Sequence, residues 1–167
     1  MALARTTQVL IDESKAKSYL MVTAAASPSL WAGLRADLSS MVMPGQRSLH
    51  MKSESEGRRI QIADRILSAV ADSLVVDVID AGRIGTERTR RARCLETVVD
   101  LAFRSGGAHL IIDRDLGLQQ FDRQQLIEAV RGRATDGTVT YEHRSRHEDP
   151  GLAVPDAIAW AWARNDQ

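Results

Sequence analysis

Hydrophobic and polar positions along the chain follow two different periods. Short apolar or β-branched runs, some alternating with polar residues, are typical of strands, whereas apolar residues three or four positions apart are typical of helices. Strands are predicted at residues 8–12, 19–24, 74–79, 109–113 and 138–144. Helices are predicted around residues 30–38, 60–70, 89–104 and 122–130, and from residue 155 onward. Because strands and helices alternate in the second half, the pattern predicts an α/β protein.

Turn and capping signals add detail to this order. The polar segment 13–18 suits a hairpin between the first two strands, and Gly106-Gly107 should end the helix before them. Asp122, with Gln125 three residues later, resembles a capping box that opens the next helix. The whole chain, 1–167, is predicted to form one domain. Its mixed five-stranded sheet carries helices on both faces, with a helical insertion of about residues 28–72 between strands two and three.

Composition narrows the class of protein. Apolar residues make up 44% of the chain and charged residues 26%, as in ordinary globular proteins. Cys94 is the single cysteine, which excludes an internal disulfide framework and a zinc site built from several thiolates. No apolar stretch approaches the roughly 20 residues of a membrane span. We therefore expect a cytoplasmic protein without a membrane partner, and the composition leaves the oligomeric state open.

The charge is balanced overall but uneven locally. The chain has 22 basic and 22 acidic residues, yet residues 83–93 contain five arginines against Glu87 alone, a local balance of +4. A solvated loop and helix start would explain this run. Alternatively, Arg90 and Arg91 could belong to a rim that contacts the phosphates of a nucleic acid, since phosphate neutralisation supplies most non-specific affinity.

Two strands end in an acidic residue. Asp12 follows the apolar run 9–11, and Asp113 follows the run 110–112. A carboxylate at the end of a buried strand is costly unless a cation or hydrogen bonds compensate it. Either residue could instead end its strand as a turn-forming aspartate, and Asp115 competes with Asp113 for the same role.

Two further acids lie on predicted helices. Asp156 opens an apolar C-terminal helix, where a carboxylate also favours the helix dipole, and Asp149 is its alternative. Glu96 lies at the flank of an apolar helix face, from which it could reach a metal or pair with Arg93 or Arg104.

Together these acids would form a site for hard divalent cations. Carboxylate oxygens suit Mg²⁺ or Mn²⁺, and two such ions can activate water and stabilise the leaving oxygen of a phosphodiester. Asp12 would bridge both ions, with Asp113 and Glu96 on one and Asp156 on the other. The predicted substrate-binding residues are Lys15, Lys52, Arg90 and Arg91. His50 would serve as a general acid or a phosphate contact, although a lone histidine is often only a helix-start group.

Several short motifs resemble a known family. Asp12-Glu13-Ser14 resembles the opening of the DUF3800 proteins, a group placed in the ribonuclease H-like superfamily. Segment 44–52, with Glu54 and Arg58-Arg59, is similar to an actinobacterial branch, and segment 154–161 is similar to the family's closing helix. Without the insertion, the predicted element order is also that of the ribonuclease H fold. The resemblance implies this fold and a nuclease-like site, but Lys15 stands where the family usually has glycine.

The sequence supports two classes of function. One is a metal-dependent phosphodiesterase acting on nucleic acid, and the other is a non-catalytic module of the same fold that binds nucleic acid or a protein. Four carboxylates converging in one shallow site would favour catalysis. A site filled by the Lys15 ammonium or by an arginine would favour the module.

Overall fold

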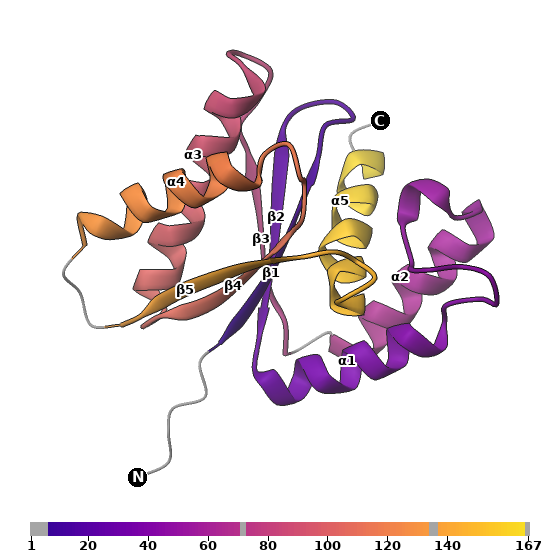
Figure 1. Cartoon of the computed structure of the whole chain (residues 1–167). Helices are drawn as coiled ribbons and strands as arrows, with labels where there is room; N and C mark the ends of the chain where they lie inside the picture. Colours follow the sequence, from indigo (N-terminus) through magenta and orange to yellow (C-terminus); the bar gives the residue numbers. More distant parts are fainter. Residues whose placement is uncertain (1–6, 71–72, 134–136, 166–167) are drawn as a thin grey trace, which may run out of the picture.

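The computed structural model describes residues 7–70, 73–133 and 137–165 (Figure 1). The ends of the predicted domain (1–6 and 166–167) and the last two residues of the predicted insertion (71–72) lie outside the described residues. Five strands form one sheet in the order β3-β2-β1-β4-β5. The strands are β1 (Gln8–Ser14), β2 (Leu20–Ala26), β3 (Val75–Asp80), β4 (Ala108–Asp113) and β5 (Val139–Arg144).

Strand pairing confirms the predicted mixed sheet. β1 pairs antiparallel with β2, and β2 pairs antiparallel with β3. β1 also pairs parallel with β4, and β4 pairs parallel with β5. In the central parallel pair, Ile11 lies opposite Ile112, so the next residues, Asp12 and Asp113, lie side by side at the C-terminal end of this pair.

Helices cover both faces of this sheet, as predicted (Figure 1). The α-helices are α1 (Pro28–Ser40), α2 (Glu56–Val70), α3 (Glu87–Arg104), α4 (Gln119–Arg131) and α5 (Ala153–Asn165). Short 3-10 turns, η1 (Met51–Ser53) and η2 (Pro150–Leu152), precede α2 and α5. Leu10 and Ile111 pack with residues of α1, α2 and α5, whereas Ile11 and Ile112 pack with α3 and α4. Successive residues of a strand thus point to opposite faces of the sheet and belong to two separate hydrophobic cores.

Element boundaries match the predictions unevenly. α3 ends at Arg104, and Gly106 and Gly107 follow with φ of 85° and 110°, as their predicted role in ending the helix requires. The capping box at Asp122 was wrong: α4 begins at Gln119, and Asp122 is fully buried inside its first turn. A buried arginine partner, described below, draws this carboxylate inward. Among the described residues, no helix is long and apolar enough to cross a membrane.

Candidate functional site

Three of the four predicted acids lie together at one edge of the sheet. Asp12 shares its face of β1 with Leu10, and Asp113 shares its face of β4 with Ile111, so both point to the side covered by α5. Asp156, in the first turn of α5, approaches them from that helix. Asp12 and Asp156 are buried, and the Asp113 side chain is 22% exposed.

The helical insertion supplies the fourth side of this cluster. The backbone N–H of Met51 in η1 donates to Asp156 Oδ2 at 2.8 Å, and His50 Nδ1 lies 3.2 Å from the same oxygen. Arg59 of α2 braces the turn by donating to the Met51 carbonyl at 2.7 Å. Because these contacts fix the backbone, His50 is held at the rim with its side chain 39% exposed.

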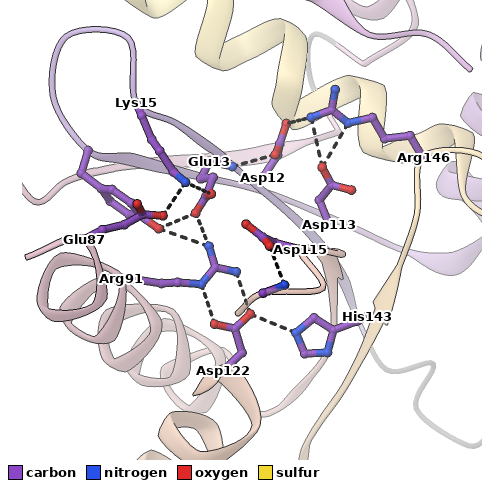
Figure 2. A network of polar contacts seen from close by, with 12 residues as sticks. Asp12, Glu13, Lys15, Glu87, Arg91, Asp113, Asp115, Asp122, His143 and Arg146 are labelled. Carbon is purple, nitrogen blue, oxygen red and sulfur yellow. Dashed lines mark hydrogen bonds and ion pairs between the residues drawn. The ribbon is translucent and has the colours of Figure 1, made fainter. Parts of the chain in front are cut away.

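An arginine that the sequence reasoning missed, Arg146, lies among these carboxylates, and Figure 2 shows it with Asp12 and Asp113. Arg146 Nη2 lies 2.8 Å from Asp12 Oδ2 and 3.0 Å from Asp113 Oδ2. Its Nη1 lies 3.3 Å from Asp156 Oδ2 and also contacts His50 Nδ1. One guanidinium therefore pairs with all three carboxylates. Arg146 follows β5 by two residues, and β5 is the parallel neighbour of β4. Because the C-terminal ends of parallel strands lie at the same end of a sheet, this position could have predicted that Arg146 lies near Asp113.

The loop that carries Arg146 is held by a second acid. Asp149 is buried and accepts hydrogen bonds from Arg35 Nε at 2.8 Å and from Arg144 Nη1 at 2.9 Å. It also caps η2 through the Gly151 N–H at 2.9 Å. Asp149, the sequence alternative to Asp156, thus has its charge matched by two arginines and fixes the backbone on either side of Arg146.

The charge balance differs sharply between these acids. Two arginines hold the pKa of Asp149 below its ordinary value although burial opposes them. At the cluster, burial raises the pKa of Asp12 and Asp113, and Arg146 lowers it only in part. Repulsion from Asp156 raises the pKa of both, whereas a hydrogen bond with Asp12 lowers that of Asp113. Burial works against the charge of Arg146, yet its three carboxylate neighbours raise its pKa. One cation therefore faces three carboxylates and compensates the charges of Asp12 and Asp113 only in part.

Glu96 does not join the cluster. It is exposed on α3, which packs on the opposite face of the sheet, and it lines a hollow of about 530 Å³ between α3 and α4. The sequence reasoning placed it at the flank of an apolar face but could not tell which side of the sheet that face would cover. The structure thus brings together three of the four predicted acids and places Glu96 apart from them.

Arg91 is also placed differently from the prediction. Its side chain is only 2% exposed, and it donates to Asp122 through Nε at 2.5 Å and Nη2 at 2.6 Å. Arg91 Nη1 contacts Glu13, and His143 Nε2 lies 3.0 Å from Asp122 (Figure 2). This buried network ties α3, α4 and β5 to the end of β1. The expectation that Arg91 faces phosphate was wrong, because its donors are used inside the protein.

Of the other predicted basic residues, Lys15 and Lys52 lie beside the cluster, whereas Arg90 does not. Lys15 pairs with Glu13 at 3.0 Å and with Glu87, so its ammonium does not fill the carboxylate cluster. Arg90 donates to the Gly82 carbonyl at 3.3 Å. Lys52 is exposed and forms no ion pair within the described part of the chain.

Two hollows flank the cluster. One, of about 580 Å³, extends past Arg114, Asp115 and Leu116, and the other, of about 610 Å³, extends along α5 past Arg59 and Trp160. Both hollows are lined by Glu13, Lys15, His50, Lys52 and Arg146. The cluster is therefore reached by an open path with cationic side chains along both arms.

The three carboxylates supply hard oxygen donors of the kind that Mg²⁺ and Mn²⁺ prefer. Their chemistry fits a divalent ion, and their negative charge exceeds that of the single arginine between them. Among residues 7–70, 73–133 and 137–165, however, no group of three His, Cys, Asp or Glu side chains is arranged ready to hold a metal. The donor set fits an ion only if Arg146 is displaced.

Comparison with solved structures defines the class of fold. The chain is similar to a chain of the PCNA:RNase HII complex from Archaeoglobus fulgidus, with a TM-score of 0.55, 16% identity, and coverage of 95% of this chain and 73% of that one. It is also similar to ribonuclease H2 from Pyrococcus horikoshii OT3, with a TM-score of 0.58, 13% identity, and coverage of 95% and 72%. The chain has a ribonuclease H-like fold, as predicted.

The narrower family assignment has no such support. No protein-family model and no curated protein sequence matches the chain. The resemblance to DUF3800 and its actinobacterial branch therefore stays a resemblance of short motifs.

Proposed function

We propose that this protein is a metal-dependent phosphodiesterase that cleaves nucleic acid, with Asp12, Asp113 and Asp156 as the ligands of Mg²⁺ or Mn²⁺. The observation that carries the proposal is the convergence of these three carboxylates, from β1, β4 and α5, around a single positive charge. A purely structural ion pair would match its charges, as Asp149 does with two arginines. Under-compensated acids in a cleft are typical of functional sites.

The residues around the cluster would have separate roles. When bound, a divalent ion would activate water and stabilise negative charge on a phosphodiester oxygen. Asp12 and Asp156, fixed by backbone N–H groups, would orient the ligand oxygens. His50, exposed at the rim beside Asp156, would give a proton to the leaving oxygen.

The lining of the two hollows supports a nucleic acid as substrate. The chain as a whole has no net charge, yet Lys15, Lys52 and Arg146 line the path through both hollows, with Arg114 added in one and Arg59 in the other. Glu13 also lines both hollows and pairs with Lys15. Such a path follows a phosphate backbone without reading its bases. The ribonuclease H-like fold of the neighbours named above agrees with this class of substrate.

The second candidate function is a non-catalytic module that binds nucleic acid. The observation in its favour is Arg146, which fills the cluster with an internal cation. In such a module the arginine would stay in place permanently, and the carboxylates would serve only to hold it.

A cleavage assay distinguishes the nuclease from the non-catalytic module. Purified protein is incubated with RNA, DNA and RNA–DNA hybrid oligonucleotides in Mg²⁺, Mn²⁺ or EDTA. We expect cleavage that EDTA abolishes. Asp12→Asn should lower the cleavage rate at least about 100-fold, which corresponds to about 2.7 kcal/mol of lost transition-state stabilisation. Glu96→Gln, an acid on the opposite face, is the matched control and should keep wild-type activity. Binding without cleavage on every substrate would favour the module.

A further inference from the structure

Arg146 and a divalent ion would need the same oxygens. The guanidinium uses Oδ2 of Asp12, Oδ2 of Asp113 and Oδ2 of Asp156, one oxygen from each carboxylate. These are the oxygens that point to the shared centre. A divalent ion coordinates carboxylate oxygens at close to 2 Å, so an ion at this centre would lie in the space that the Arg146 guanidinium, 2.8 to 3.3 Å from the same oxygens, already occupies.

The charges of the cluster also indicate that Arg146 and a divalent ion cannot occupy it together. With all three carboxylates ionised, as binding of an ion requires, the cluster carries two negative charges more than Arg146 balances, and a divalent ion would balance them. A guanidinium left within a few ångströms of that ion would meet strong repulsion in a partly buried site, where Coulomb energies are weakly screened. The Arg146 side chain is 16% exposed.

The surrounding structure allows the side chain to move while the backbone stays. Asp149 holds the loop through Arg35 and Arg144, and the Glu148 carboxylate accepts from the Ser145 N–H at 2.7 Å. Arg146 itself borders both hollows beside the cluster. Rotation about its side-chain bonds would carry the guanidinium from the carboxylates into the path proposed for the phosphate backbone.

We propose that Arg146 is an internal competitor of the divalent ion: it occupies the carboxylate cluster in the ion-free protein, and the ion binds only by displacing it into the substrate path. This inference rests on the proposed metal-binding role of the three carboxylates. It makes Arg146 the residue that sets ion affinity, and it reconciles a carboxylate set suited to metal with an arginine at its centre.

The test is Mn²⁺ binding to the full chain, measured by isothermal titration calorimetry without substrate. Arg146→Gln removes the competing charge and should bind Mn²⁺ at least about tenfold more tightly than wild type, a difference of about 1.4 kcal/mol. Arg146→Lys keeps the charge but not the fork that reaches three carboxylates, so it should lie between them. The matched control, Arg93→Gln, removes an exposed cation on the opposite face of the sheet and should stay within about twofold of wild type.

The outcomes separate this inference from the proposed function. Equal or weaker Mn²⁺ binding by Arg146→Gln overturns the competition, even if the wild-type protein cleaves nucleic acid. Tight binding by Arg146→Gln with no cleavage by any variant supports the competition and overturns the nuclease. If Arg146→Gln does not fold, the lysine variant decides: affinity no higher than wild type refutes the inference.

Discussion

Replacing Arg91 by methionine should destabilise the protein strongly, although Arg91 lies outside the proposed catalytic cluster. Methionine keeps much of the apolar stem but removes five donors. Asp122, fully buried, would lose two short hydrogen bonds, at 2.5 and 2.6 Å, and Glu13 would lose its buried cationic partner.

The magnitude follows from this geometry. Breaking one side of a buried ion pair costs about 3–5 kcal/mol, because the remaining charge is left uncompensated. His143 still contacts Asp122 at 3.0 Å, which favours the lower end of that range. For a chain of this size about 1 kcal/mol shifts Tm by roughly 2–4 °C, so a loss of about 3 kcal/mol should lower Tm by about 6–12 °C.

Reversible urea unfolding followed by circular dichroism would measure the loss. Arg93→Met, an exposed arginine on the same helix, is the matched control and should change stability by no more than about 0.5 kcal/mol. The double variant Arg91→Met/Asp122→Leu should lose less than the sum of the single variants, because it leaves no unpaired Asp122 charge. A loss below about 1 kcal/mol in Arg91→Met, or strictly additive single variants, would refute the reasoning.

Two other predictions concern ions and pH. A divalent ion at a hundredfold excess over its Kd should stabilise the wild-type protein by about 2.7 kcal/mol and so raise its Tm. The double variant Asp12→Asn/Asp113→Asn should lose this response. Melting curves recorded with the ion and with EDTA would measure both effects. A wild-type Tm indifferent to Mg²⁺ and Mn²⁺ would contradict the metal site. Stability should also fall as the pH drops below about 4: arginine partners lower the native pKa of Asp122 and Asp149 from 3.8, so their contribution is present above that unfolded value and lost as pH falls through the native one. Because Asp12 and Asp113, whose native pKa is raised, have the opposite pH dependence, urea titrations compare wild type with Asp122→Asn and Asp149→Asn. An identical change in stability between pH 5 and pH 3 in all three proteins would count against these ion pairs.

Much of the fold could be predicted because periodicity reports which residues are buried. The apolar runs before Asp12 and Asp113 identified two central strands, and the sheet places them side by side. The residue at which each helix begins was harder to predict. Asp122 has the sequence context of a helix cap, but a buried arginine 31 residues away in the chain determines where it lies.

The candidate site was predictable only in part for the same reason. A strand-end acid has its position fixed by the strand, so Asp12 and Asp113 could be placed together once their strands were recognised. Glu96 depends on which face its helix covers, and helical periodicity alone carries no information on that choice. Arg146 lies in an irregular loop, where no period indicates the direction of a side chain.

Three groups of acids at and near this edge of the sheet show how structural and functional charges can be told apart. Asp149 has two arginine partners, and Asp122 shares Arg91 with Glu13 and also contacts His143, so an arginine in these networks pairs with at most two carboxylates. The cluster of Asp12, Asp113 and Asp156 shares one arginine. Since leaving buried charge unmatched costs stability, this third arrangement is poorly explained as a brace for the fold. It is well explained if a further cation completes it, which is why ion affinity and the fate of Arg146 are the decisive measurements.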